Sequence, residues 1–171
     1  MLVKTIFEGN FYVYFGIVPV ILLFLPFRLI TGMHLSTYCA TQIFVSFAII
    51  GFFCFFYELR KKFFHKMSLQ LYLTLSVGLS AISVWYATWA PALYCTAISA
   101  GICMMIWSVY FYFKAVYVYT EENMQIKTSA WGALFGALCF GCRPTIALAN
   151  IAILPMLILF LQEHKINVKS M

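Results

Sequence analysis

The sequence predicts an all-α protein, a polytopic transmembrane helical bundle of five to six helical segments in one domain, residues 1–171. Hydrophobic residues make up 64% of the chain and charged residues only 9%, whereas a soluble domain carries about a quarter charged residues. The longest uncharged run, from Met67 to Phe113, has 47 residues, and one bilayer crossing needs about 20. Because backbone polar groups must be paired in lipid and strand-like alternation is absent, the apolar runs are interpreted as helices.

The first helical segment is expected at about residues 11–27. Pro19 and Pro26 interrupt it, so it either crosses the membrane with a kink or lies as a juxtamembrane segment at the outer face. Residues 28–37 are interpreted as a polar turn.

Five further helical segments are expected along the chain, and the more polar residues 114–128 are interpreted as a loop. Ser36 or Thr37 is suited to cap the next helix, and Ser68 the one after it. The segment from 129 to 142 has only about 14 residues, or about 21 Å, short of a hydrocarbon core of about 30 Å. With the segment after it, it therefore forms either two crossings or a shallow hairpin. The expected segments are 37–57, 68–86, 92–113, 129–142 and 144–162.

Lys and Arg are unevenly distributed between the gaps, and this distribution predicts the topology. The basic gaps are 58–66, 114–128 and the tail after 162, and the gaps poor in Lys and Arg are 28–37 and 85–91. Basic loops favour the cytoplasmic side, so we expect a multi-pass protein of the cell membrane with a cytoplasmic C-terminus and Arg143 toward the outside. The net charge of +6 therefore indicates anionic membrane lipid as a partner and no nucleic acid.

Arg143 is the first candidate for a functional residue. It is the only charged residue between Lys127 and Glu163. A charge at membrane depth costs about 2.5 kcal/mol or more and marks a functional site by default. The forked donors of a guanidinium suit a phosphate group. The alternative is that Arg143 only marks the outer end of a helical hairpin and extends toward the lipid head groups.

Glu8 and the aromatic residues that follow it form the second candidate. At the outer surface, Glu8 would serve as a catalytic acid or base, and Tyr12 and Tyr14 would bind substrate by stacking on a sugar or lipid. The alternative is an aromatic belt at the membrane interface before a helix.

No metal site and no cofactor are expected. The chain has no Asp, and its three His residues lie in separate polar gaps. Cys139 and Cys142 have the C-x-x-C spacing, but their apolar surroundings favour small buried side chains over redox chemistry. Gly132 and Gly136 are spaced to let a helix approach a neighbour closely.

Two stretches of the chain carry a pattern known from other membrane proteins. The first stretch is Gly-Asn-Phe-Tyr-Val-Tyr-Phe-Gly-Ile-Val-Pro at 9–19, followed by Leu-Pro at 25–26 and Leu-Ile-Thr-Gly at 29–32. The second runs from Gly132 to Arg143 and into Pro-Thr, and its Gly-Cys-Arg-Pro string is similar to membrane proteins of Gram-positive bacteria. Together the two stretches resemble bacterial polytopic membrane glycosyltransferases of the GT-C fold, of the family-39-like and aminoarabinose-transferase-like kind.

The resemblance implies a protein that uses a polyprenyl-phosphate sugar donor, with Arg143 on the donor phosphate and Tyr12 and Tyr14 at the acceptor or lipid entrance. Such proteins carry their catalytic acid in an outer loop after an earlier helix, and this chain is expected to begin after both and to lack that acidic loop. They also carry a Lys before the proline, which this chain lacks near Pro19. The expectation is therefore a partial chain, with Glu8 as the acidic residue available to an outer face. The alternative function is a non-catalytic membrane protein, such as a transporter fragment or an assembly partner.

Overall fold

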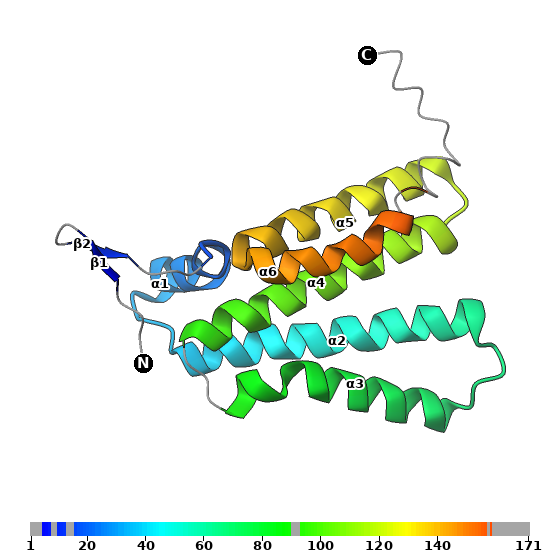
Figure 1. Cartoon of the computed structure of the whole chain (residues 1–171), viewed down its shortest axis with the longest axis horizontal. Helices are drawn as coiled ribbons and strands as arrows, with labels where there is room; N and C mark the ends of the chain where they lie inside the picture. The colour runs from blue at the N-terminus through cyan, green and yellow to red at the C-terminus, as the bar shows by residue number, and fades with distance from the viewer. Residues whose placement is uncertain (1–4, 8–9, 13–15, 90–92, 157, 159–171) are drawn as a thin grey trace, which may run out of the picture.

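Four long helices form the body of the molecule (Figure 1). The computed structural model describes residues 5–7, 10–12, 16–89, 93–156 and 158. Consecutive long helices run in opposite directions, and α4 lies between the others, in contact with α2, α3 and α5. The four are α2 (Thr37–Phe63), α3 (Leu69–Trp89), α4 (Leu93–Tyr117) and α5 (Glu122–Cys142).

The helical class is confirmed, but several helices extend beyond their apolar runs. Helix α2 continues past residue 57 to Phe63, and α4 past residue 113 to Tyr117. The loop expected at 114–128 is wrong for most of its length, because α5 begins at Glu122. Glu, Lys and Arg are good helix formers, so the helical hydrogen bonds continue through the charged flanks. With 21 residues, α5 is about 31 Å long, and its length no longer calls for a shallow hairpin.

Two helices of the described chain are long and apolar enough to cross a membrane. They are Thr37–Phe63 and Tyr94–Tyr117, and the shorter apolar helices are Val20–Thr31 and Leu69–Ile82. The structure thus supports membrane association through α2 and α4.

The N-terminal region differs from the prediction. Strands β1 (Thr5–Phe7) and β2 (Asn10–Tyr12) pair as an antiparallel hairpin, with Thr5 opposite Tyr12. A helix starting at about residue 11 is therefore wrong, and the aromatic residues of β2 are of the kind that favours strands.

The first helical segment begins later than expected and also ends later. A π-helical stretch, η1 (Val20–Phe24), continues into α1 (Leu25–Thr31), which includes Arg28. The polar turn expected from residue 28 therefore starts too early. Helix α1 ends at Gly32, whose φ of 70° is the left-handed conformation that glycine adopts without strain.

The chain after α5 returns along the bundle. Helix α6 (Pro144–Ala147) and the 3-10 helix η2 (Leu148–Ile153) both contact α4, and α6 also contacts α5. The start predicted for the last segment is confirmed at Pro144, which occupies the first helical position that proline favours. Residues 157 and 159–162 of that prediction lie outside the described residues.

Small residues allow α4 and α5 to pack closely, as the spacing of Gly132 and Gly136 predicts. The Ser108 hydroxyl of α4 donates to the Gly132 carbonyl at 2.8 Å. A Cβ atom at Gly132 would lie 2.9 Å from Cδ2 of Tyr112, and one at Gly136 would lie 3.2 Å from Oγ of Ser108. These contacts identify α4 as the neighbour of the glycine face, which the spacing alone does not specify.

Helices α2 and α4 are joined by polar contacts within the apolar bundle. The hydroxyls of Thr41 and Thr96 lie 2.8 Å apart, and both residues are almost fully buried. The indole N–H of Trp107 donates to the Phe47 carbonyl at 3.2 Å. These pairs fix the position of α4, which begins at the end of the bundle where α5 meets α6.

Candidate functional site

Arg143 lies at the junction between α5 and α6, where the chain reverses direction. Its backbone is extended, with φ −155° and ψ 115°. Its N–H donates to the Cys139 carbonyl at 3.0 Å, and its own carbonyl accepts from the N–H groups of Ile146 and Ala147 at 3.1 Å. The backbone of Arg143 is thus held from both helices, and the origin of its side chain is fixed.

The guanidinium of Arg143 stacks on the ring of Tyr94 at the start of α4. The guanidinium carbon lies 3.8 Å from the ring centroid, and Nη1 donates to the phenol oxygen at 3.1 Å. Tyr94 is 47% exposed and Arg143 is half-buried. Stacking on an aromatic face holds a guanidinium in place while its edge donors stay available for a planar or tetrahedral anion.

No carboxylate of the described residues pairs with Arg143. Its side chain donates one hydrogen bond within the described chain, to Tyr94, and a guanidinium has five N–H donors. The remaining donors suit the oxygens of a phosphate, which pair with arginine through short, charge-assisted hydrogen bonds.

The N-terminal segment is anchored beside Arg143 by a close backbone approach. A Cβ atom at Gly16 would collide with the carbonyl oxygens of Gly141 and Cys142, and one at Gly141 would lie 2.5 Å from Cγ2 of Val18. Only glycine at position 16 permits this crossing, and it brings the start of the first helical segment to the end of α5.

The predicted site residues are described to different extents. Tyr12 lies in strand β2, which Figure 1 places at the same end of the molecule as the α5–α6 junction. Glu8 and Tyr14 lie outside the described residues. The catalytic role of Glu8 and the substrate-binding roles of Tyr12 and Tyr14 therefore stay predictions.

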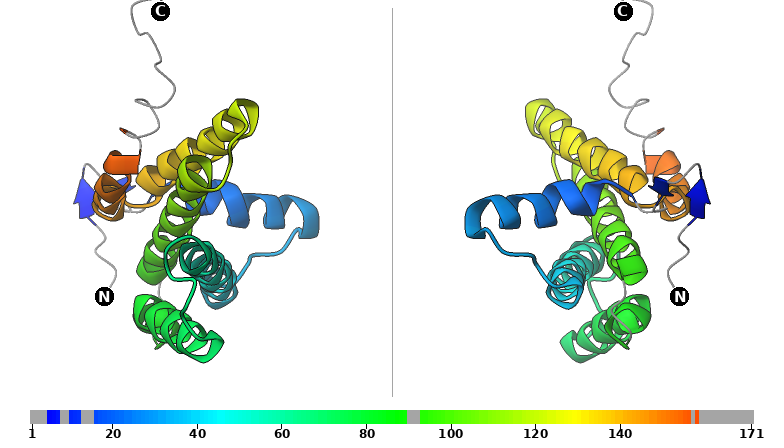
Figure 2. Two further views of the ribbon diagram at one scale, coloured as in Figure 1. Left: turned by 90° about the vertical axis from the view of Figure 1, so that its right-hand side faces the viewer. Right: turned by 90° about the vertical axis from the view of Figure 1, so that its left-hand side faces the viewer.

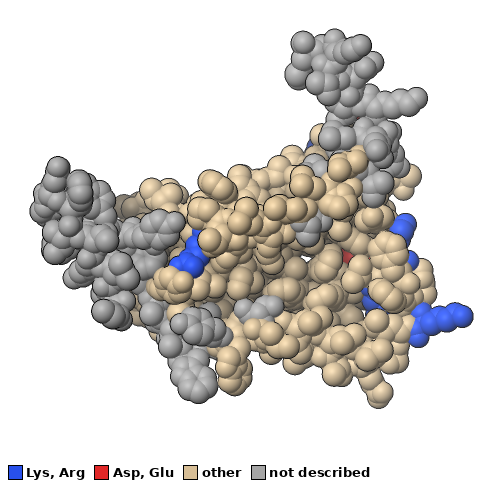
Figure 3. Space-filling model, in the orientation of Figure 1, with Lys and Arg blue, Asp and Glu red and all other residues tan. Residues whose placement is uncertain are grey.

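The bundle has two ends with different chemistry. We call the end with Arg143, Tyr94 and the start of α2 the Arg143 end. The opposite end, with the α2–α3 and α4–α5 turns, is called the basic end, because it carries Arg60, Lys61, Lys62, Lys66 and Lys114. In the face shown in Figure 3, Lys and Arg side chains lie toward the two ends of the described bundle.

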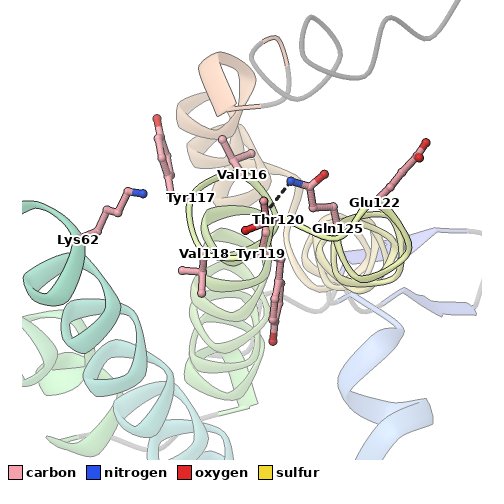
Figure 4. Close-up of a pocket in the computed structure, with 8 residues that line it drawn as sticks. All are labelled: Lys62, Val116, Tyr117, Val118, Tyr119, Thr120, Glu122 and Gln125. Atoms are coloured by element: carbon pink, nitrogen blue, oxygen red, sulfur yellow. Dashed lines mark hydrogen bonds between the residues drawn. The ribbon is translucent and has the colours of Figure 1, made fainter.

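An open hollow of about 550 Å³ lies at the basic end (Figure 4). Lys62 approaches it from α2, and the end of α4 and the start of α5 line the rest. The side-chain amide of Gln125 donates to the Tyr119 carbonyl at 2.7 Å and closes the α4–α5 turn. The sequence offered no signal for this hollow, because its lining comes from segments about 60 residues apart.

Two basic residues at this end have structural contacts. The Nε of Arg60 donates to the Met67 carbonyl at 3.1 Å, and its guanidinium lies 5.7 Å from the ring of Tyr72. Lys114 lies between two tyrosine rings, with its ammonium 5.4 Å from the ring of Tyr110 and 5.0 Å from that of Tyr119. Arg60 is therefore held by a backbone and an aromatic partner, and Lys114 by two aromatic partners.

The cysteine pair is buried, as its apolar surroundings predict. Cys139 and Cys142 are both fully buried, and the Cys139 thiol donates to the Gly101 carbonyl at 3.4 Å. Among the described residues, no group of three His, Cys, Asp or Glu side chains is placed to hold a metal ion.

Tyr94 is the functional candidate that sequence reasoning missed. The sequence does contain a signal for it. The predicted topology places the start of the helix expected at 92–113, where Tyr94 lies, on the same side of the membrane as Arg143. Comparisons of the chain with protein-family models, with curated proteins and with solved structures find no match.

Proposed function

We propose that this chain is a multi-pass membrane protein in which α2, α3, α4, α5 and the segment expected at residues 144–162 cross the bilayer. Besides α2 and α4, helix α3 also supports a multi-pass protein, because it presents a nearly unbroken apolar surface away from the bundle. A helix that exposes so much apolar surface is suited to lipid and not to water. The exposed apolar residues of α3 are Leu69, Leu71, Leu73, Leu75, Val77, Leu79, Ile82 and Trp85.

The proposed topology places the basic end and the C-terminus in the cytoplasm and the Arg143 end at the outer face. The basic end carries most of the Lys and Arg residues of the described chain, and such ends favour the cytoplasmic side. The Arg143 end then meets the head groups of the outer leaflet.

The proposed function is the binding of a polyprenyl-phosphate sugar donor by a glycosyltransferase-like module. The observation that carries it is the guanidinium of Arg143, stacked on Tyr94 at the end of an apolar bundle and without a carboxylate partner in the described chain. A polyprenyl phosphate joins a long apolar chain to an anionic head group, so the bundle surface would hold the chain and Arg143 the phosphate.

In this proposal the chain binds and orients the donor. Tyr94 would keep the guanidinium in one orientation, so that less side-chain entropy is lost when the phosphate binds. Tyr12 and Tyr14 would line the acceptor or lipid entrance, and Glu8 would be the acid or base. The resemblance to GT-C proteins supports the roles of Tyr12 and Tyr14, and Glu8 is proposed as the acidic residue available to an outer face.

Direct binding tests the proposal. The wild type and Arg143→Gln are placed in nanodiscs of a neutral lipid, and polyprenyl phosphate is titrated into each. Loss of a charged hydrogen-bond partner is expected to weaken binding by about tenfold to a hundredfold. Lys62→Gln at the basic end is the matched control and should bind as the wild type does. Equal affinity in the wild type and Arg143→Gln contradicts the assignment.

A second titration, with the uncharged polyprenol, separates phosphate recognition from binding of the apolar chain. The proposal requires that Arg143→Gln and the wild type bind polyprenol equally. If the protein binds a polyprenyl-phosphate sugar donor at Arg143 but transfers no sugar from it, the non-catalytic alternative is favoured. The chain would then be an assembly partner that presents the lipid.

A further inference from the structure

We propose that the η1–α1 helix, Val20–Thr31, lies in the plane of the membrane, embedded where the head groups meet the acyl chains of the leaflet at the Arg143 end. The proposal rests on the membrane-spanning bundle of the proposed function. It assigns a lipid surface as the partner of a helix that the described chain leaves uncovered.

The first observation is the exposure of the helix. Helix α1 has no buried residue, and its contacts in the described chain are chiefly with η1. Leu29 is 77% exposed and Ile30 is 83% exposed, and Leu22 and Leu25 are exposed as well. Apolar side chains on most of the circumference of a helix are unfavourable in water, so this surface requires an apolar partner.

The second observation is the direction of the helix. Figure 2 views the bundle along its length, so that α2 and α3 are seen nearly end-on, whereas α1 runs sideways across the view. In Figure 1 the same helix is seen nearly end-on beside the bundle. The η1–α1 helix is therefore roughly perpendicular to the helices that cross the membrane in the proposed function.

The third observation is its length. Val20–Thr31 has 12 residues and is about 18 Å long, against a hydrocarbon core of about 30 Å. A helix of this length cannot cross the core in any orientation. Together with its direction, this excludes the kinked crossing that the sequence left open for the first segment.

The fourth observation is that both ends of the helix are fixed at the same level of the bundle. Before it, Gly16 packs on the backbone of Gly141 and Cys142 at the end of α5. After it, Gly32 ends α1, and Ser36 caps α2 by accepting from the N–H of Cys39 at 3.2 Å. Since α5 ends and α2 begins at the Arg143 end, the helix leaves and rejoins the bundle on one side of the membrane.

The polar residues of the helix are compatible with this depth. The Thr31 hydroxyl donates to the Phe27 carbonyl at 2.7 Å and accepts from the N–H of Met33, so it needs no water. Arg28 is exposed and is the one charged residue of Val20–Thr31. A long arginine side chain can reach the head groups from a helix embedded just below them.

Depth-dependent quenching tests the proposal on the whole chain. Leu22→Cys, Leu25→Cys and Leu29→Cys are each labelled with an environment-sensitive fluorophore in nanodiscs whose lipids carry a quencher near the head group or near the acyl-chain end. Cys39 and Cys54 are replaced beforehand, because the other four cysteines are buried. All three positions are exposed, so the substitutions leave the bundle packing intact.

The expected result is one shallow depth at all three positions, with stronger quenching by the head-group probe. The matched controls are Leu71→Cys, Leu75→Cys and Ile82→Cys on α3, which should show a graded depth across the bilayer. Graded depth along Val20–Thr31 would overturn the in-plane helix, and so would emission typical of water. Protection of the fluorophore from both quenchers, together with energy transfer between labelled copies, would also overturn the proposal, because a second copy of the chain would then cover the helix. A flat profile on α3 would instead contradict the spanning bundle.

Discussion

The guanidinium carbon of Arg143 lies 3.8 Å from the ring centroid of Tyr94, although the two residues are 49 positions apart in the sequence. The stack joins the α5–α6 junction to the start of α4, and so fixes a cation at one end of an apolar bundle.

Tyr94→Leu should weaken the binding of polyprenyl phosphate without removing the charge of Arg143. Loss of the stack removes about 0.5–2 kcal/mol of interaction that holds the guanidinium in place. Tyr94→Phe keeps the ring and loses one hydrogen bond, so its effect should be smaller. Titrations in nanodiscs measure both, and wild-type affinity in Tyr94→Leu would show that Arg143 does not need the ring.

Gly132→Val should destabilise the bundle because its side chain enters the space of the Tyr112 ring. Gly78→Val is the control, since a Cβ atom at Gly78 meets nothing within 4 Å. Both substitutions change helix propensity equally, so the difference in unfolding free energy reports packing, and about 1–3 kcal/mol is expected. Unfolding by SDS titration measures it, and equal loss in the two variants would contradict the close α4–α5 contact.

A double-mutant cycle on Thr41 and Thr96 should detect their hydrogen bond. Thr41→Val and Thr96→Val keep the side-chain shape, and each leaves the other hydroxyl without its partner across the α2–α4 interface. The coupling free energy should be about 0.5–1.5 kcal/mol, the range for a hydrogen bond between helices in a membrane. Strictly additive single effects in the same SDS titration would mean that the two hydroxyls do not interact.

Arg60→Met should loosen the α2–α3 turn. The substitution removes the hydrogen bond to the Met67 carbonyl and the contact with the Tyr72 ring but keeps an apolar stem of similar length. Hydrogen exchange at residues 64–68 should become faster, with little change at the Arg143 end. Lys61→Met at the neighbouring exposed position is the control, and the same exchange rates in both variants would contradict the role of Arg60.

The two ends of the bundle should label from opposite sides of the membrane. With Cys39 and Cys54 replaced, Met33→Cys reports on the Arg143 end and Lys66→Cys on the basic end, and both positions are exposed. A membrane-impermeant maleimide should react with Met33→Cys in intact cells and with Lys66→Cys in inverted vesicles. Reaction of both variants from one side would contradict the proposed crossing of the membrane by α2, which lies between the two positions.

Local signals in the sequence predicted much of the helical structure. Ser36 and Ser68 were expected to cap helices, and each accepts a backbone N–H three residues later. The glycine spacing in α5 predicted a close neighbour. These features depend on residues within one or two helical turns of each other, so they can be predicted from the sequence without knowledge of the tertiary structure.

The errors have two physical origins. Apolar runs mark what prefers lipid, whereas helices also continue through charged residues such as Glu58 and Lys127, so the helix ends were misplaced. The contact of Tyr94 with Arg143 and the crossing of Gly16 over Gly141 depend on tertiary packing. No periodicity or spacing encodes such pairs, and they become visible only when the helices are placed together.

Photo-crosslinking with a polyprenyl phosphate that carries a diazirine next to the phosphate shows directly whether the phosphate binds at Arg143. The probe is added to the wild type in nanodiscs, and the labelled peptides are identified by mass spectrometry. We expect crosslinks around Tyr94 and Arg143 that unlabelled polyprenyl phosphate removes and polyprenol does not. Crosslinks confined to the basic end around Lys62, or competed equally by polyprenol, would contradict binding of the phosphate at Arg143.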